Sequence, residues 1–299
     1  DFRWANLILA WFGAGGSLEA GHMLTPSSWA RGLLVHDLRF AGSRFHLDWG
    51  QAGASEVFWT DTVEDPMRYR AIPTNAAGFR HEAALEHARL GVSILDARSA
   101  ETPRFPKRDA AAGVYGACDL TWRPAPAWTL AAETSLASIA DRNDATGGAV
   151  AWIRRTFGPA LDVETKMWYL GEAFNPATGF YGLAGDEEGA VAIRLPWRPG
   201  SGVRFTPGFG WKQRFAESFY LPSAELNWET PWGLDVTIKE AGEQPIGRWG
   251  AEDHYEYTRA EISWQFWTPA WITLRWEKIY DGYARAKVQQ WLAETTMRF

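Results

Sequence analysis

The chain has 299 residues, a formal net charge of −6, one cysteine and 19 tryptophans. It contains no basic run and no aromatic–basic cluster, so a nucleic-acid partner is not expected. The single thiol of Cys118 excludes an internal disulfide, and the six scattered histidines give no metal-ligand spacing, so no metal or other cofactor is expected. The most apolar run, residues 5–12, is shorter than the roughly 20 residues that a membrane-spanning helix needs.

The first 51 residues are predicted to form three strands. Residues 2–12 are apolar nearly throughout and are predicted as the first strand, followed by a glycine-rich loop over residues 13–28. Residues 29–40 and 44–51 are predicted as two strands joined by a tight turn at Ala41-Gly42-Ser43. Because the chain opens at Asp1 without a charged export segment, we expect a mature form whose export signal has been removed.

The pattern of the next 60 residues is less regular. Residues 53–78 contain two prolines and several acidic residues and are predicted as the longest loop. Residues 79–89 and 90–99 are predicted as strands, with a helix over 80–89 as the alternative, and residues 101–110 as a polar loop. From there a clean series of hairpins is predicted, with strands at residues 113–122, 128–138, 148–157, 161–174, 189–197, 203–215, 219–229 and 234–242.

The end of the chain, residues 254–299, shows the alternation most clearly. Ala260, Ile262, Trp264 and Phe266 fall on one side of the first of its three segments, and the residues between them are polar or charged. Successive side chains of a strand point to opposite faces, so each segment is predicted as a strand with one apolar and one charged face. This pattern is typical of a transmembrane β-barrel.

The connections between the predicted strands fall into two classes. One class is short and centred on proline, at residues 123–127, 158–160, 198–202, 230–233 and 268–270, and the class between them is mostly longer and polar. Tryptophans recur beside the short class, as a membrane-interface girdle would require, although aromatic residues in the core of a soluble sandwich are the alternative. The predicted girdle consists of Trp122, Trp128, Trp197, Trp228, Trp232, Trp267 and Trp271.

These observations predict an all-β fold consisting of one closed antiparallel transmembrane β-barrel over residues 1–299. The count is about sixteen strands, or fourteen if the segments at 2–12 or 79–99 are misassigned. The barrel must close because lipid cannot satisfy the hydrogen-bonding groups at a sheet edge. The short turns would lie on the periplasmic side, the longer loops outside, and the loop at 53–78 would fold over or into the barrel mouth.

The chain resembles a Gram-negative outer-membrane β-barrel of the porin-like kind. The resemblance covers the whole chain in pattern and is most specific in the final strand, WLAETTMRF, which ends on the aromatic residue Phe299. It implies a location in the bacterial outer membrane, surrounded by outer-membrane lipid. It also implies that Phe299 is the assembly signal that the barrel-assembly machinery reads.

The charged faces of the predicted strands would line the lumen. Their charges either set the preference of a pore for ions or solutes, or form salt bridges that stiffen the wall. The mixed signs argue against a strongly selective anion or cation channel. The predicted lumen-lining residues are Arg39, Arg44, Asp119, Glu133, Glu164, Lys166, Arg194, Arg204, Glu225, Lys239, Arg259, Glu261, Arg275, Glu277, Glu294 and Arg298.

The favoured function is therefore a channel for passive passage of ions or small polar solutes. The alternative is a structural barrel that anchors or encloses a partner in a larger outer-membrane complex, and a homo-oligomer is a further option. An outer-membrane hydrolase is a minor alternative. A barrel phospholipase would need a Ser/His pair on its outer face at the lipid boundary, and His and carboxylate residues at a barrel rim are commonly just solvated. The candidate groups for a hydrolase, Glu252-Asp253-His254 and His81-Glu82, are expected near the outer loops; no catalytic residue is assigned.

Overall fold

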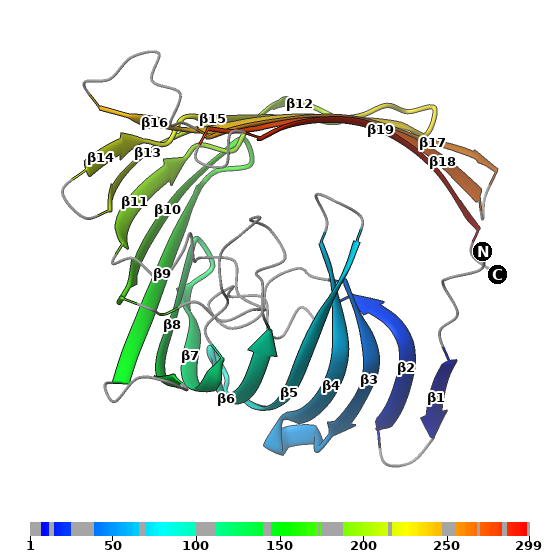
Figure 1. Ribbon diagram of the computed structural model, residues 1–299. Coiled ribbons are helices and arrows are strands. Elements are labelled where there is room, and N and C mark those ends of the chain that lie inside the picture. Colours follow the sequence, from blue (N-terminus) through cyan, green and yellow to red (C-terminus); the bar gives the residue numbers. More distant parts are fainter. Residues whose placement is uncertain are drawn as a thin grey trace. The chain divides into compact units, whose positions relative to one another are not determined.

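The computed structural model shows an all-β chain (Figure 1). It describes residues 7–11, 15–24, 39–65, 70–99, 112–139, 145–172, 174, 188–214, 217–246, 255–267, 270–282 and 286–297. No helix within these ranges is long and apolar enough to cross a membrane. The first strands are β1 (Leu7–Trp11), β2 (Gly16–Leu24), β3 (Arg39–Asp48), β4 (Ala54–Asp65), β5 (Arg70–Ala84), β6 (Ala88–Ser99), β7 (Gly113–Ala125), β8 (Trp128–Ile139), β9 (Ala145–Phe157) and β10 (Leu161–Leu170).

The remaining strands follow in the second half of the chain, and one 3-10 turn, η2 (Gly50–Ala52), lies between β3 and β4. The strands are β11 (Glu188–Arg194), β12 (Trp197–Gly200), β13 (Val203–Arg214), β14 (Glu217–Tyr220), β15 (Ser223–Glu229), β16 (Leu234–Pro245), β17 (Tyr255–Trp267), β18 (Ala270–Asp281) and β19 (Ala286–Met297).

The chain divides into two compact units. Unit 1 comprises residues 1–152 and 168–188, and unit 2 comprises residues 153–167 and 189–299. In unit 1, strands β1 to β8 pair in chain order, each antiparallel to the next. In unit 2, the same up-and-down order runs from β12 to β19. Each unit is therefore a meander in which neighbours in sequence are neighbours in the sheet.

Two strands of unit 2 are each interrupted once. β11 and β12 both pair with β13, and β14 and β15 both pair with β13 and β16. The breaks fall at Leu195-Pro196 and Leu221-Pro222, where a proline cannot donate a hydrogen bond to the ladder. Counting each interrupted strand once reduces the 19 described segments to 17 strands (19 − 2), close to the expected sixteen.

The expected difference between short and long connections is present. The connections after β7, β9 and β12 span residues 126–127, 158–160 and 201–202, whereas those after β6 and β10 span residues 100–112 and 171–187. In a meander, alternate connections lie at opposite ends of the strands. Each unit therefore has one end whose connections are all short, which we refer to as the short-turn end.

Side-chain exposure alternates along the strands as the sequence predicted. In β7, Val114 is 50% exposed, whereas its neighbour Tyr115 is fully buried, and the alternation continues to Leu120. Cys118 is exposed and lies on the same face as Val114. We refer to this face of the strands as the exposed face, and to the opposite one as the buried face.

Three expectations for the first hundred residues are wrong. β2 occupies much of the predicted loop 13–28, and β3 runs without interruption through the predicted turn at Ala41-Gly42-Ser43. Gly42 is required here by a close approach, because a Cβ atom would lie 2.0 Å from the carbonyl oxygen of Trp59. The register of β3 and β4 shifts at the same point. Glycine in this segment therefore marks a β-bulge inside a strand and not a turn.

The predicted loop over residues 53–78 is also wrong, because β4 and the first half of β5 lie within it. Pro73 stands opposite Thr62 at a second register shift, so the sheet accommodates the missing N–H at an irregularity. β5 is a strand and not the alternative helix over 80–89, and it ends at Ala84. The predicted loop over residues 101–110 lies outside the described part of the chain.

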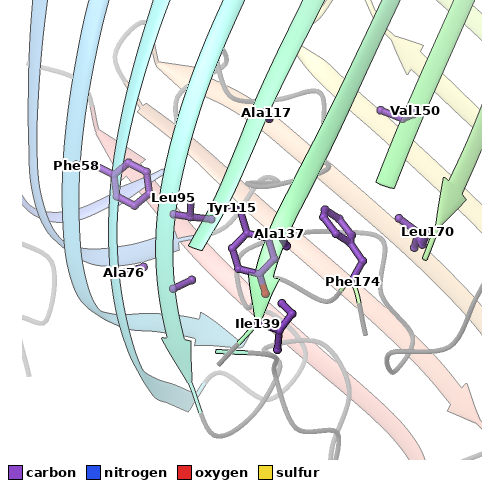
Figure 2. Packing of buried hydrophobic residues seen from close by; sticks show 11 residues of the cluster. Phe58, Ala76, Leu95, Tyr115, Ala117, Ala137, Ile139, Val150, Leu170 and Phe174 are labelled. Atoms are coloured by element: carbon purple, nitrogen blue, oxygen red, sulfur yellow. The ribbon is translucent and has the colours of Figure 1, made fainter. Parts of the chain in front are cut away.

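An apolar cluster occupies the buried face of unit 1 (Figure 2), which the sequence did not predict. Tyr115 and Phe174 meet edge to face with ring centroids 5.7 Å apart, and Phe174 is only 2% exposed. Phe174 comes from the connection after β10, and Gly171 and Glu172 of that connection are hydrogen-bonded to β9. The other members are Phe58, Ala76, Leu95, Ala97, Ala117, Ala137, Ile139, Val150 and Leu170, with Trp168 packed against them.

The substitution Phe174→Ala is expected to destabilise unit 1 by about 3 kcal/mol, because it leaves a cavity against Tyr115. Heat-induced unfolding of the purified protein, followed by circular dichroism, measures the change. Phe79→Ala is the matched control, since Phe79 is an exposed-face phenylalanine. Equal melting temperatures for the two variants would contradict the role given to Phe174.

Candidate functional site: the charged face of the sheet

The residues predicted to line a lumen share the buried face wherever their side chains are described. Asp119, Glu133 and Glu277 are buried, and Lys239 is the most exposed of the set. The side chains of Arg39 and Glu294 and the whole of Arg298 lie outside the described part. The others are half-buried: Arg44, Glu164, Lys166, Arg194, Arg204, Glu225, Arg259, Glu261 and Arg275.

The most enclosed ion pair of unit 1 joins Arg80 of β5 to Asp119 of β7, and its side chains are 5% and 4% exposed. The guanidinium donates to both carboxylate oxygens of Asp119, with Nη2 to Oδ1 at 3.0 Å. It also donates to Ser93 Oγ at 3.1 Å and to Glu82 Oε2 at 3.1 Å. Such a two-pronged, charge-assisted arrangement fixes the orientation of the arginine.

This pair spans an intervening strand, and Gly91 of β6 makes the crossing possible. Gly91 stands opposite Glu82 on one side and Asp119 on the other. A Cβ atom at Gly91 would lie 2.2 Å from Asp119 Oδ2 and 2.4 Å from Arg80 Nη2. The guanidinium therefore lies flat across the backbone of β6. Arg80 was missed in the sequence, since nothing in its own strand shows that its partner is two strands away.

Three further contacts involve residues of β3 on the buried face of unit 1. Arg44 of β3 forms an ion pair with Glu19 of β2, which stands directly opposite in the register. His46 Nδ1 lies 4.0 Å from Glu56 Oε2 of β4. Asp48 accepts a hydrogen bond from the backbone of Gly50 at 2.7 Å, so it caps the connection between β3 and β4.

At the short-turn end of unit 2, a buried carboxylate holds two arginines. Asp162 of β10 accepts hydrogen bonds from Arg154 of β9 and from Arg198 Nη2 of β12 at 3.1 Å. Arg154 Nε also lies 3.8 Å from Glu164. The three strands are thus joined on one face by charge as well as by their backbones.

A second group in unit 2 lies on β11, β15 and β16. Arg194 donates to Glu225 at 2.8 Å, and Asn227 donates to the same carboxylate at 2.9 Å. Asn227 in turn accepts from Thr237 Oγ1 at 3.1 Å. These contacts form a continuous polar strip along the buried face.

Further along β13 lies a more enclosed group. Glu243 of β16 forms ion pairs with Lys212 and, at 3.1 Å, with Arg214. Both cations lie over the ring of Phe219, at 5.3 Å and 5.4 Å from its centroid. The aromatic face adds an attraction of the cation–π type to the ion pairs.

The last three strands carry a ladder of alternating charges. Arg259 of β17 forms an ion pair with Glu261 of the same strand, and Arg275 Nε of β18 donates to Glu261 at 2.6 Å. Glu277 accepts from Gln290 of β19 at 2.9 Å. The ladder follows directly from the register, since Glu261 stands opposite Arg275 and Glu277 opposite Gln290.

Arg204 is the exception on this face. It stands opposite Asn227 and beside the position of Arg198, and no acidic side chain of the described chain pairs with it. Its Nε atom is buried without an acceptor. Arg204 therefore contributes positive charge that no described carboxylate balances.

The tryptophans of the predicted girdle lie beside the short connections, but not all of them lie on the exposed face. Trp122, Trp197, Trp228 and Trp232 are exposed, and Trp128 is half-buried. Trp271 stands opposite Gln265 and shares the face of Thr273 and Arg275. The side chain of Trp267 is outside the described part. Further exposed tryptophans that the prediction did not include are Trp49, Trp59, Trp211, Trp264 and Trp291.

The hydrolase candidates do not form a catalytic group in the described residues. His81-Glu82 was expected near the longer loops, but it lies just before the short connection 85–87, because β5 and β6 meet there. Glu252-Asp253-His254 is outside the described part. Within the described ranges, no group of three His, Cys, Asp or Glu side chains could hold a metal ion.

Known structures place this arrangement in a fold group. No family model matches the chain, and no curated protein matches it. Pseudomonas aeruginosa OpdK with vanillate superposes with a TM-score of 0.60 at 13% identity, over 87% of this chain and 75% of that one. P. aeruginosa OpdL gives a TM-score of 0.56 at 14% identity, over 98% and 91% of the two chains. Acinetobacter baumannii OccAB3 gives 0.53 at 9% identity, over 95% and 91%.

These three proteins are outer-membrane porins. The chain has the porin fold. The predicted resemblance to a Gram-negative outer-membrane β-barrel is thus confirmed as a likeness of fold, as is the all-β antiparallel class.

The substitution Gly91→Ala is expected to lower the melting temperature of the porin-like chain, because its methyl group would displace the Arg80 guanidinium from Asp119. Disturbing a buried ion pair in this way costs up to about 3 kcal/mol. Differential scanning calorimetry in detergent measures the loss. Gly116→Ala on β7 is the control, since a Cβ atom there meets nothing within 4 Å; an equal loss in that variant would contradict the steric account.

Proposed function

We propose that the chain is an outer-membrane channel for passive passage of ions or small polar solutes, formed by a single barrel over residues 1–299. The observation that carries this proposal is the separation of chemistry between the two strand faces. Most side chains of the exposed face are apolar, while hydrogen-bonded charged and polar side chains follow the buried face from β2 to β19. A wall of this kind suits lipid on one side and water on the other.

The lining predicted from the sequence would make such a channel weakly selective. Most of its charges are compensated by neighbours, as in the pairs Arg80–Asp119, Arg194–Glu225 and Arg275–Glu261. Paired charges leave little net field for a passing ion. Arg204 shifts this balance towards anions, and vanillate, the ligand named with OpdK, is therefore a reasonable first solute to test.

Planar-bilayer recording tests the proposal directly. Purified protein is expected to produce discrete conductance steps, because a barrel of about this many strands with a polar inner wall can hold an aqueous channel. A protein that inserts but stays silent, and that co-purifies with stable partners, would instead be a structural barrel within a larger envelope complex. The porin neighbours are not enzymes, and we propose no enzymatic activity.

The partners proposed for the chain follow from its class. Lipid of the outer membrane would surround the exposed face, and the barrel-assembly machinery would read Phe299. Association into a homo-oligomer or with other envelope proteins remains part of the proposal. Phe299 itself lies outside the described residues.

Arg204→Ala is expected to reduce the preference for chloride over potassium, because it removes a cation of the charged face that no described carboxylate balances. The reversal potential in a salt gradient measures the permeability ratio, and a reduction of about twofold is expected from the loss of one charge near the path. Arg155→Ala is the control, since Arg155 lies on the exposed face over the ring of Phe157. An unchanged ratio in Arg204→Ala would remove Arg204 from the conduction path.

Trp264→Asp is expected to reduce assembly into membranes, because it places a carboxylate on the exposed face between Leu234 and Ile272. The cost is at most about 2 kcal/mol, and it becomes smaller towards the membrane interface. The heat-modifiable folded band on a gel measures the yield. Ser263→Asp puts the same charge on the buried face, where Ser263 is hydrogen-bonded to Thr273, and is expected to assemble better. Equal yields would argue against lipid at the exposed face.

A further inference from the structure

Three polar side chains interrupt the exposed face of unit 1 at its short-turn end. Ser55 of β4 stands directly opposite His81 of β5 in the register, and its Oγ atom lies 2.9 Å from His81 Nδ1. Trp49, in the connection after β3, donates from Nε1 to Ser55 Oγ at 2.8 Å. Side-chain hydrogen bonds of this cluster therefore join the connection after β3 to β4, and β4 to β5.

The surroundings of this cluster are apolar. His81 lies two residues from Phe79 and opposite Val92 of β6, and Ser55 lies two residues from Val57. Phe79, Val57 and Val92 are all exposed. Trp49 is 55% exposed, and its position beside a short connection is that of an interfacial tryptophan.

The direction of the hydrogen bonds follows from donor chemistry. An indole can only donate, so Ser55 Oγ accepts from Trp49. If Ser55 also accepted from His81, its own hydroxyl hydrogen would need another acceptor, and none is present among the described residues. The arrangement that satisfies the indole, the hydroxyl and Nδ1 together has Ser55 donating to Nδ1, which leaves the hydrogen of the neutral imidazole on Nε2.

The Nε2–H group then has no acceptor of its own. No described side chain or backbone oxygen bonds to it, and its neighbours on the exposed face are hydrocarbon. An N–H donor facing only acyl chains would cost several kcal/mol in solvation, on the order of 2–7 kcal/mol. At the height of an interfacial tryptophan, however, phospholipids present phosphate and ester oxygens, which are strong acceptors.

We propose that Trp49, Ser55 and His81 form a binding site for the headgroup region of a phospholipid, with His81 Nε2 donating to a phosphate or ester oxygen. The inference rests on the proposed membrane location of the exposed face. Trp49 would cover the glycerol region with its ring, while its indole nitrogen fixes the orientation of Ser55 and hence of the imidazole. The site selects a lipid by its acceptor oxygens and its depth in the membrane.

A Ser/His pair at a lipid boundary is also the smallest set of catalytic residues that an acyl hydrolase could use. The geometry here favours lipid binding over hydrolysis. A nucleophilic serine needs a base that a third group orients, and donors for the oxyanion. No described carboxylate contacts His81, whose ring is bonded only to Ser55. The nearby backbone N–H of Gly53 is already used, since it donates to Gly50 O at 3.1 Å.

The test is native mass spectrometry of the full chain in detergent, titrated with phosphatidylglycerol. His81→Phe keeps the size of the ring and removes the donor, and it is expected to weaken the tightest lipid adduct about tenfold, the value of one charge-assisted hydrogen bond. Ser55→Ala is the second variant, expected to weaken the same adduct through loss of the imidazole orientation. Ser138→Ala, at an exposed serine on β8, is the matched control and is expected to bind as the wild type does.

Three results would overturn the proposal. Wild-type lipid affinity in both His81→Phe and Ser55→Ala would show that the cluster does not bind lipid. Displacement of the adduct by millimolar inorganic phosphate would show that free phosphate, and not a lipid, is the ligand. Labelling of Ser55 by a fluorophosphonate would show a reactive nucleophile and hence a hydrolase.

Conductance measured on the same preparations separates this inference from the proposed channel. If the His81→Phe variant conducts normally but loses the lipid adduct, the result supports both the channel and the lipid site. A silent wild type that still binds lipid through His81 contradicts the channel and supports the lipid site.

Discussion

The structure depends on the pairing of every strand with its neighbours in sequence. Backbone N–H and C=O groups form hydrogen bonds between neighbouring strands in the plane of the sheet, and successive side chains therefore point to its two opposite faces. In β17 and β18 the register runs without a shift from Tyr255–Asp281 to Gln265–Trp271, so residues two apart stay on the same face along this length. Once this alternation is set, the apolar side chains have only one face to occupy, and the charges must meet one another on the other.

The meeting of charges explains how the buried face tolerates so many ionisable groups. A half-buried charge is costly unless a partner and further hydrogen bonds satisfy it. Glu261 and Asp162 each accept hydrogen bonds from two arginines. Asp119 accepts hydrogen bonds from two nitrogen atoms of one guanidinium group. The pairs run across strands, so they also oppose any slip in register, since a shift by one residue would place every charge on the apolar face.

The sequence predicts this organisation well where the alternation is strict and poorly where it is broken. From residue 113 onward, each predicted strand overlaps an observed one, because period-two patterning and proline-centred turns agree, although two of them are interrupted and β19 begins five residues earlier than predicted. Before residue 100, Gly42 and Pro73 resemble turn residues, yet they mark bulges inside β3–β4 and β4–β5, where close backbone approach favours glycine and an irregular register accommodates proline. A single sequence does not distinguish these two uses of the same residues.

The candidate site shows the same division. Which residues share the buried face follows from counting by two, and Arg259, Glu261, Arg275 and Glu277 can be placed in this way. Counting by two does not predict which residues are in contact when the contact spans an intervening strand. The ion pair between Arg80 and Asp119, which crosses β6 at Gly91, is such a contact. The cluster around Tyr115 and Phe174 was equally hidden, because half of that contact comes from a connection and not from a strand.

The positions that depart from the two-face rule are those most suited to function. Arg204 lacks the carboxylate that its neighbours on the charged face have, so its field extends to whatever passes that face. Ser55 and His81 are polar among exposed-face neighbours that are hydrocarbon, Val57, Phe79 and Val92, so their last donor must be satisfied from outside the chain. A wall in which every residue obeyed the pattern would be stable but chemically uniform. Recognition, of a solute on one face or of a lipid on the other, requires a group whose partner the fold itself does not supply.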